Sequence, residues 1–295
     1  MSETQNRIRF TKMTGSGNDF IIIDNRVLKL EKERGRELAR LACRRRMSVG
    51  ADGLILIEND SEADFGWQFF NADGSEAEMC GNGARCAARF ALMKGIVNEE
   101  RLSFRTLAGL IEAQVFGERA KVRMTQPHSL EVDIAVALGD CLFHLNFINT
   151  GVPHTVYFAE SEAQLNDLDV FDRGRCIRFH ERFQPMGSNA NFVFVRGPHD
   201  ISIRTYERGV EAETLACGTG CIAAALIAAA KDLAASPVKV LTMSGETLVI
   251  YFEKISKEGE TSFSDVYMEG DAKVVYDGEL WDETLRGQKG GRNVV

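Results

Sequence analysis

Two near-identical short motifs, Cys80-Gly-Asn-Gly and Cys217-Gly-Thr-Gly, each lead directly into an alanine-rich stretch. A cysteine at the first turn of a helix lies beside unpaired backbone N–H groups and at the positive end of the helix dipole. Both effects favour the thiolate. One such cysteine would indicate a nucleophile, whereas a repeated pair indicates two acid–base groups that face one substrate.

The surroundings of the two motifs predict the fold class. Short strand-like runs with alternating apolar and polar residues recur along most of the chain, as in largely antiparallel sheets. Few segments favour helix, and we expect helices at residues 35–46, 82–94, 162–167 and 218–234. A helix that is apolar nearly all round must be buried. The sequence therefore predicts an α+β fold of two pseudo-symmetric domains, each a mostly antiparallel sheet curled around a central helix.

Composition excludes several classes of partner. The chain has 295 residues, 44% of them hydrophobic and 26% charged, which is typical of a globular protein. Its formal net charge of −8 argues against nucleic-acid and anionic-membrane partners. The segment Met1–Arg7 lacks the apolar core of a signal peptide, and the apolar run at 221–230 is too short to span a bilayer. We expect a cytoplasmic protein, with the oligomeric state left open, a homodimer included.

The other cysteines favour structural roles. The seven cysteines have an odd count and scattered spacing, unlike a disulfide framework or a structural zinc site, and a cytoplasm would keep them reduced. Cys86 and Cys221 lie deeper along the two predicted helices, so we expect them in the core. Cys43, Cys141 and Cys176 are predicted to be small buried hydrophobes.

Four polar residues near the motifs are candidates for a site. Asn71 ends a predicted strand just before the first motif, where its amide could meet a ligand. His154 follows a Gly-Val-Pro turn, and the sequence supports a structural and a chemical role equally. Glu207 and Arg208 are adjacent, which usually marks a solvated surface pair. Near an amino-acid site they would instead bind an ammonium and a carboxylate group.

Paired thiols suit stereoinversion at a carbon that carries an amine and a carboxylate. That reaction needs a base on one face of the carbon and an acid on the other. A thiol can serve in either role, since free cysteine titrates at roughly 8.5 and a helix N-terminus can lower that value. The glycines of both motifs would let the backbone approach a substrate carboxylate, which helix N-termini can bind.

Taken together, these residues resemble the diaminopimelate epimerase family, whose members interconvert LL- and meso-diaminopimelate without pyridoxal phosphate, on the route to lysine and peptidoglycan. The resemblance runs from Phe10 to about Tyr276. Its most specific motifs are Lys12-Met13 with Gly17-Asn18-Asp19-Phe20, Asn71-x-Asp-Gly-Ser-x-Ala-Glu-Met-Cys80-Gly-Asn-Gly, Asn189-x-Asn-Phe192, and Tyr206-Glu-Arg-Gly-Val210 with Ala216-Cys217-Gly-Thr-Gly220.

The resemblance implies a domain division and a place for the site. We expect an N-terminal domain of residues 1–127 together with about 273–285, and a C-terminal domain of residues 128–272. The family places its site in the cleft between two such domains. It also implies that the last strand, near 273–275, returns to the first domain, and that no cofactor or metal takes part.

The resemblance also implies roles for individual residues. Cys80 and Cys217 match the catalytic thiols, and His154 and Glu207 match the groups that assist their proton transfer. Asparagine and arginine side chains match the groups that hold the amino and distal carboxylate ends of the substrate, and backbone near the motifs matches the cradle of the α-carboxylate. The predicted substrate-binding residues are Asn18, Asn71, Gly81, Asn82, Asn189, Arg208, Gly218 and Thr219.

Three positions depart from the usual family pattern. Thr14 stands where His or Gln is frequent, Val152 stands where an Asn often precedes Pro-His, and Gly53 stands where some members carry a ligand-binding Gln. The missing amide at Val152 removes one donor for the distal end of the substrate. These departures bear on the identity of the substrate and leave the type of reaction unchanged.

The predicted function is therefore cofactor-independent epimerisation of LL-diaminopimelate to meso-diaminopimelate by two thiols. One alternative is a racemase of another amino acid, such as histidine, on the same fold. A second is a thiol redox sensor that switches through a Cys80–Cys217 disulfide. A third, an amino-acid-binding module, leaves the paired cysteines without a purpose.

Overall fold

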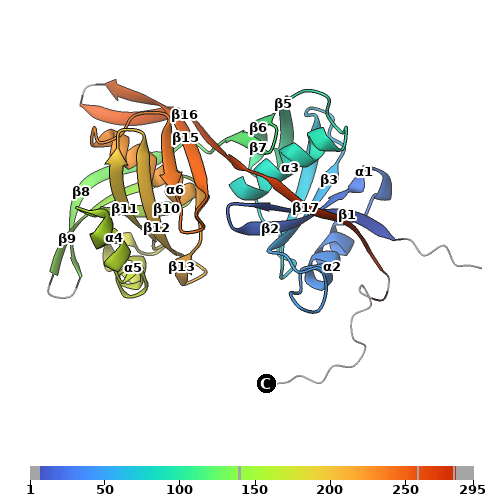
Figure 1. Ribbon diagram of the computed structural model, residues 1–295, viewed down its shortest axis with the longest axis horizontal. Coiled ribbons are helices and arrows are strands. Elements are labelled where there is room, and N and C mark those ends of the chain that lie inside the picture. Colours follow the sequence, from blue (N-terminus) through green and yellow to red (C-terminus); the bar gives the residue numbers. More distant parts are fainter. Residues whose placement is uncertain (1–6, 139–140, 258, 282, 284–295) are drawn as a thin grey trace, which may run out of the picture. The chain divides into compact units, whose positions relative to one another are not determined.

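The computed structural model describes residues 7–138, 141–257, 259–281 and 283. The described part of the chain divides into two compact units (Figure 1). The first unit contains the residues up to Ala120 and those from Asp271 onward, and the second contains Lys121–Gly270. The chain passes from one unit to the other within strands β7 (Arg119–Arg123) and β16 (Glu260–Asp271).

The sheet of the first unit has the strand order β17–β1–β2–β3–β4–β5–β6. Neighbouring strands are antiparallel except at two places, β2–β3 and β4–β5, where they are parallel. The C-terminal strand thus pairs with the first strand of the chain. The bounds are β1 Ile8–Gly15, β2 Asn18–Asp24, β3 Gly53–Glu58, β4 Phe65–Asn71, β5 Arg101–Thr106, β6 Gly109–Phe116 and β17 Lys273–Leu280.

The second unit repeats this pattern in the order β8–β9–β10–β11–β12–β14–β15. Its parallel steps, β10–β11 and β12–β14, fall at the same two places in the order. Strand β16 extends this sheet beside β15, and the short β13 (Ala212–Thr214) pairs with β12. The bounds are β8 His128–Leu138, β9 Cys141–Asn149, β10 Pro153–Phe158, β11 Asn189–Gly197, β12 Asp200–Glu207, β14 Val238–Leu241 and β15 Thr247–Lys257.

The helices lie at the parallel steps, because a parallel pair of strands needs a long crossover connection. In the first unit, the connection at the first parallel step contains α1 (Asn25–Leu28) and α2 (Lys32–Ala42). In the second unit, the corresponding connection contains α4 (Glu162–Asp167), α5 (Val170–Phe179) and the 3₁₀ turn η1 (Glu181–Phe183). The second step carries the central helix, α3 (Gly81–Met93) or α6 (Gly218–Ala230). The predicted α+β fold of two pseudo-symmetric halves is confirmed.

Both sheets are covered on both faces near these helices. In β3, Leu54 and Leu56 cluster with Leu38 of α2, while the intervening Ile55 lies against Gly83 of α3. Side chains alternate along a strand, so a strand covered on both faces becomes an uninterrupted apolar run. The second unit shows the same alternation, since Ala190 and Phe192 of β11 cluster with residues of α5. The side chain between them faces α6, as described below.

Most predicted helices agree with the structure, but some details were wrong. Helix α4 has the predicted bounds, and α3 and α6 begin within a residue of those predicted. The helix predicted at residues 35–46 spans Lys32–Ala42 as α2, with Cys43 as its C-cap, and the helix predicted to reach residue 234 ends at Ala230 as α6. Helix α5 was missed because it is short and contains Gly174, a residue that disfavours a helix interior. That glycine is needed for packing, since a Cβ there would lie 2.3 Å from Cβ of Tyr206.

The cysteine predictions were mostly right. Cys86 and Cys221 are fully buried in the central helices, and Cys43 is buried as well. Cys176 is exposed on α5, so its predicted burial was wrong. The side chain of Cys141 lies outside the described residues. In the part of the chain that the structure describes, each helix is too short or too polar to cross a membrane.

Candidate active site

Each motif cysteine is the N-cap of a central helix. Cys80 precedes α3 with extended backbone (φ −142°, ψ 118°), and Cys217 precedes α6 in a similar conformation (φ −126°, ψ 108°). The Sγ atom of Cys80 accepts a hydrogen bond from the N–H of Gly83 at 3.5 Å. The Sγ atom of Cys217 lies 3.5 Å from Oγ1 of Thr219. Both sulfur atoms therefore lie where the helix dipole favours negative charge.

The backbone next to these cysteines is held by side chains of the same unit. In the second unit, Oγ1 of Thr150 donates to the carbonyl of Thr219 at 3.1 Å. In the first unit, a guanidinium nitrogen of Arg85 lies 3.5 Å from the carbonyl of Gly81. These contacts leave the N–H groups of the first helical turn, at Gly81 and Gly218 among others, directed along the axis toward the N-terminus. Such groups can bind a carboxylate.

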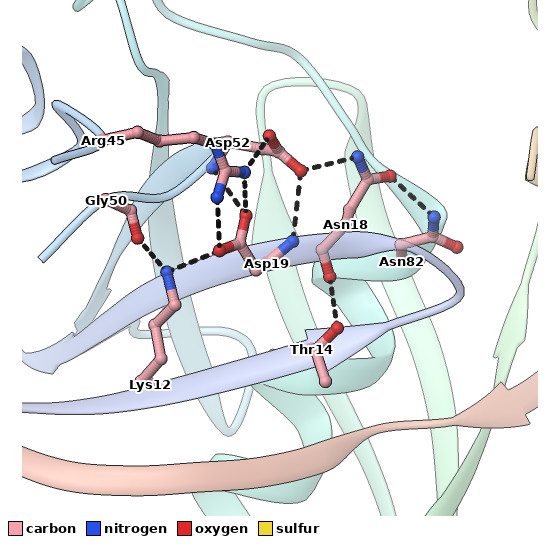
Figure 2. Close-up of polar contacts among 8 residues, drawn as sticks. All are labelled: Lys12, Thr14, Asn18, Asp19, Arg45, Gly50, Asp52 and Asn82. Atoms are coloured by element: carbon pink, nitrogen blue, oxygen red, sulfur yellow. Dashed lines mark hydrogen bonds and ion pairs between the residues drawn. The ribbon is translucent and has the colours of Figure 1, made fainter. Parts of the chain in front are cut away.

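Asn18, predicted to bind substrate, lies in a directional chain of hydrogen bonds in the first unit (Figure 2). Its Nδ2 donates to Oδ2 of Asp52 at 3.0 Å, and its Oδ1 accepts from Nδ2 of Asn82 at 2.8 Å. A carboxylate only accepts, so Asp52 fixes which end of the Asn18 amide is the nitrogen. The orientation of Asn82 follows in turn, beside the first turn of α3.

Asp52 is itself held by Arg45, and Figure 2 shows the guanidinium of Arg45 between Asp52 and Asp19, with Lys12 directed at Asp19. Arg45 bridges Asp52 and Asp19, at 2.8 and 2.6 Å, and Nζ of Lys12 lies 2.7 Å from Asp19. Burial raises the pKa of Asp19, but hydrogen bonds and charges of Arg45 and Lys12 outweigh burial and hold that pKa below its ordinary value. Arg45 reaches these carboxylates from the segment that follows α2, and its side chain stays 60% exposed.

Arg85 ties α3 to the rest of the first unit. This arginine is fully buried, and its Nη2 donates to Oγ of Ser16 at 2.8 Å and to Oδ1 of Asn82 at 2.9 Å. Both amide ends of Asn82 are therefore engaged, one by Asn18 and one by Arg85. Asn82 is positioned by its own unit before any ligand is considered.

Asn71 lies outside this network. It is exposed at the end of β4, and its Nδ2 donates to Oγ of Ser75 at 3.0 Å. Asp73 accepts from both the backbone N–H and the hydroxyl of Ser75, and Gly74 has φ 80°. The Asn-x-Asp-Gly segment thus forms a turn, and Asn71 takes part in stabilising it.

His154 lies on β10 and is fully buried in the second unit. Its Nδ1 is 3.1 Å from Nδ2 of Asn191, which lies on the adjacent strand β11. Its Nε2 is buried and has no hydrogen-bond partner among the described residues. Burial, with a smaller contribution from the charge of Arg208, lowers the pKa of His154 to about 3, so the ring is neutral at physiological pH.

Asn189 and Arg208 are joined to one another. The backbone N–H of Arg208 donates to Oδ1 of Asn189 at 2.8 Å, and Nδ2 of Asn189 donates to the carbonyl of Pro153 at 3.2 Å. The guanidinium of Arg208 donates to the carbonyl of Met186 at 3.0 Å. Asn189 therefore links the backbone of Arg208 to that of Pro153, which directly precedes His154.

Glu207 ends β12, close in sequence to the second motif, and is half-buried. Burial raises the pKa of its carboxyl group, while the side chain of Thr214 acts in the opposite direction. A carboxyl group with a raised pKa can exchange a proton nearer to neutral pH than an exposed one. Burial therefore affects Glu207 and His154 differently: it moves the pKa of the carboxyl group toward neutral pH and the pKa of the imidazole away from it.

Thr14 and Gly53 have local explanations, and nothing in the structure explains the valine at position 152. Oγ1 of Thr14 donates to the carbonyl of Asn18 at 2.9 Å and so closes the turn between β1 and β2. Val152 accepts a hydrogen bond from the N–H of Thr150 through its carbonyl at 3.2 Å. At Gly53, a Cβ would lie 2.4 Å from Cε2 of Phe69, so the phenyl ring occupies the space that a longer side chain would need.

Two positioning groups were not predicted from the sequence. They are Asp52, in the segment before β3, and Asn191, which lies two residues after Asn189 in β11. Asn191 could have been noticed as a polar side chain in an otherwise apolar strand, whereas Asp52 lies just before β3 and gave no such signal. Within the described residues, His, Cys, Asp and Glu side chains form no group of three that could hold a metal ion.

The sequence matches a known family over most of its length. The sequence model described as diaminopimelate epimerase matches residues 10–130 and 146–275. The diaminopimelate epimerase of Aquifex aeolicus (strain VF5) is 48% identical, covering 94% of this chain and 99% of the relative. That of Archaeoglobus fulgidus is 41% identical, covering 95% of this chain and 99% of the relative.

Solved structures with the same fold are more distant in sequence. A phenazine biosynthesis protein of the PhzF family from Bacillus anthracis aligns with a TM-score of 0.67 at 15% identity, covering 93% of this chain and 99% of that one. A hydroxyproline epimerase from Agrobacterium vitis aligns with a TM-score of 0.66 at 13% identity, covering 95% and 94%. At these identities the likeness concerns the fold alone.

Proposed function

This chain belongs to the diaminopimelate epimerase family, and from that premise we propose that it epimerises LL-diaminopimelate to meso-diaminopimelate with Cys80 and Cys217 as its two acid–base groups. The observation that carries the proposal is that both cysteines are N-caps of equivalent helices in a repeated fold. The names of the relatives do not favour the alternative of a racemase for another amino acid. We further propose a cytoplasmic location, because the reaction needs both thiols reduced.

The reaction requires one proton to leave and another to arrive. The thiolate of one cysteine removes the α-proton, and the thiol of the other delivers its own proton to the opposite face of the same carbon. The substrate gains and loses one proton, so its charge is unchanged. The two cysteines end with their protonation states exchanged, and the reverse reaction uses them in the opposite roles.

The helix N-termini supply the remaining requirement. Removal of an α-proton places negative charge on the carboxylate and the carbon next to it. Unpaired N–H groups at the start of α3 and α6, near Gly81 and Gly218, stabilise that charge where it develops. Asn18, Asn82, Asn189 and Arg208 are the proposed contacts for the amino and distal carboxylate groups of the substrate, and Asn71 and Thr219 complete the proposed set.

A substrate panel tests the proposal. The purified protein is incubated with LL-diaminopimelate and, separately, with single-centre amino acids that include L-histidine and L-proline, and stereoisomers are resolved by chiral chromatography. We expect meso-diaminopimelate to form and the single-centre amino acids to keep their configuration. Inversion of a panel member without inversion of diaminopimelate would contradict the proposed substrate and support the racemase.

A further inference from the structure

Asn191 lies at the junction of three strands and a helix in the second unit. It belongs to β11, where it pairs across to Val156 of β10 on one side and to Thr205 of β12 on the other. Its side chain faces α6, because a Cβ built on Gly220 would lie 2.4 Å from its Oδ1. The amide is thus buried against the first turn of α6, the helix whose N-cap is Cys217.

Every hydrogen-bonding direction of the nitrogen in this amide is used. Nδ2 of Asn191 donates to the carbonyl of Thr155 at 2.8 Å and to Nδ1 of His154 at 3.1 Å. Oδ1 accepts from Oγ1 of Thr205 at 3.0 Å. A backbone carbonyl can only accept, so it requires the amide nitrogen on its side and excludes the flipped amide.

The orientation of the amide decides the state of the imidazole. Since Nδ2 donates to Nδ1 of His154, that ring nitrogen is an acceptor and carries no proton. A neutral imidazole has one proton, which must then be on Nε2. A second proton would place two N–H donors against each other at Nδ1. Nε2 is buried and without a partner among the described residues, so an N–H donor is held there ready for an acceptor.

We propose that Asn191 is a positioning residue that holds His154 as the neutral imidazole with its proton on Nε2, so that His154 donates a hydrogen bond and does not accept the proton of a thiol. Nε2 already carries a proton and Nδ1 is occupied by Asn191. An anionic acceptor, such as a thiolate or a carboxylate of the bound amino acid, would make the strongest hydrogen bond with this N–H donor. The catalytic consequence rests on the proposed function, whereas the tautomer does not.

The tautomer can be measured on the free protein. With ¹⁵N in the histidine rings, long-range ¹H–¹⁵N correlation spectra distinguish protonated from unprotonated ring nitrogens. The chain has five histidines, and the His154→Gln spectrum identifies the signals of His154 by their loss. At pH 7 we expect a protonated Nε2 and an unprotonated Nδ1. A proton on Nδ1, alone or together with one on Nε2, would overturn the proposal whether or not the protein inverts diaminopimelate.

Two variants separate positioning from packing. Asn191→Asp is nearly isosteric but puts an acceptor beside Nδ1, so the proton should move to Nδ1 and kcat/KM for diaminopimelate should fall about 100-fold. Thr205→Val removes only the hydrogen bond to Oδ1 and leaves both bonds from Nδ2, so the tautomer should stay on Nε2. An unchanged His154 spectrum and unchanged kcat/KM in Asn191→Asp would overturn the proposal. Correct spectra in a protein that inverts no diaminopimelate would instead refute only the proposed function.

Discussion

The two helix N-termini occupy equivalent places in the repeated fold, yet different chemistry holds their surroundings. Beside α3, the amides of Asn18 and Asn82 are oriented by ions, with Asp52 and Arg45 at the outer end of the chain of contacts. Beside α6, the amide of Asn191 is oriented by hydrogen bonds with neutral groups, among them Thr205 and His154. The two units thus share the position of the cysteine and the start of the helix, but they differ in the contacts that orient the neighbouring polar side chains.

The largest effect tests whether the two cysteines are equivalent in function as they are in position. Cys80→Ala and Cys217→Ala should each lower kcat for epimerisation by about 10³-fold or more, because each removes one of two obligatory acid–base groups. Initial rates with LL-diaminopimelate provide the measurement. Cys86→Ala and Cys221→Ala are the matched controls, one to two turns further along the same helices, and should remain active. Substantial turnover by either N-cap variant would break the equivalence.

A second test measures how the buried imidazole of His154, beside α6, makes the stability of the protein depend on pH. His154 has a pKa of about 3 in the folded protein and an ordinary value of 6.5, so between these values the unfolded chain binds a proton that the folded chain does not. The free energy of unfolding therefore rises with pH through this window, and the contribution of the neutral His154 is lost as the pH falls. Relative to His154→Gln, the wild type should lose about 3 kcal/mol between pH 7 and pH 4.

Urea unfolding at several pH values measures this difference. The charged network of the first unit should not contribute in the same window, because the pKa of Asp19 is lowered from 3.8 and its stabilisation is lost only at lower pH. Glu207 has a raised pKa and acts with the opposite sign, but it is present in both proteins and cancels. Parallel pH profiles for wild type and His154→Gln would show that His154 is not held neutral.

A third test places the same substitution in both helices. In Gly220→Ala the new methyl group would lie 2.4 Å from Oδ1 of Asn191, whereas in Gly83→Ala the nearest atom is Cδ1 of Ile55 at 3.3 Å. We expect Gly220→Ala to destabilise the protein by about 2 kcal/mol through overpacking. Gly83→Ala should change stability by less than about 1 kcal/mol, because alanine also favours the helix. Thermal unfolding measures the stability of both variants, and equal losses of stability would contradict the expected difference between the two helices.

The smallest effect concerns salt. Arg45→Gln removes a partly exposed ion pair, so it should cost about 0.5 kcal/mol at low salt and less at 1 M NaCl, where screening is strong. Thr205→Val removes a neutral buried hydrogen bond and should cost about 1 kcal/mol at both salt concentrations. Urea unfolding in 0.05 M and 1 M NaCl measures both. A salt-independent loss in Arg45→Gln would remove the distinction between the charged contacts beside α3 and the neutral contacts beside α6.

The sequence was sufficient where the signal was local. The two Cys-Gly-x-Gly motifs marked the starts of α3 and α6, and the boundaries of α4 followed from its own residues. Helix α5 could not be recognised locally, because Gly174 weakens the helical pattern and is explained only by its contact with Tyr206. The repeated strand order explains why a helix is needed there, since β10 and β11 are parallel.

The polar networks could not be predicted, because they depend on strand register. Asn191 meets His154 and Thr205 only when β10, β11 and β12 are aligned as they are, and a shift of one residue would turn the amide to the opposite face. Arg45 was similarly ambiguous, since a run of arginines usually remains solvated. Its partners Asp19 and Asp52 come from two other segments that the fold brings together.

The most direct test of two opposed acid–base groups is the position of the solvent label early in the reaction. The wild-type protein is incubated with LL-diaminopimelate in D₂O, and substrate and product are separated and analysed by mass spectrometry before equilibrium. Two thiols predict deuterium at the inverted carbon of meso-diaminopimelate while unreacted LL-diaminopimelate remains unlabelled. Deuterium that enters both isomers at the same initial rate would mean that a single base serves both faces, and would contradict the account.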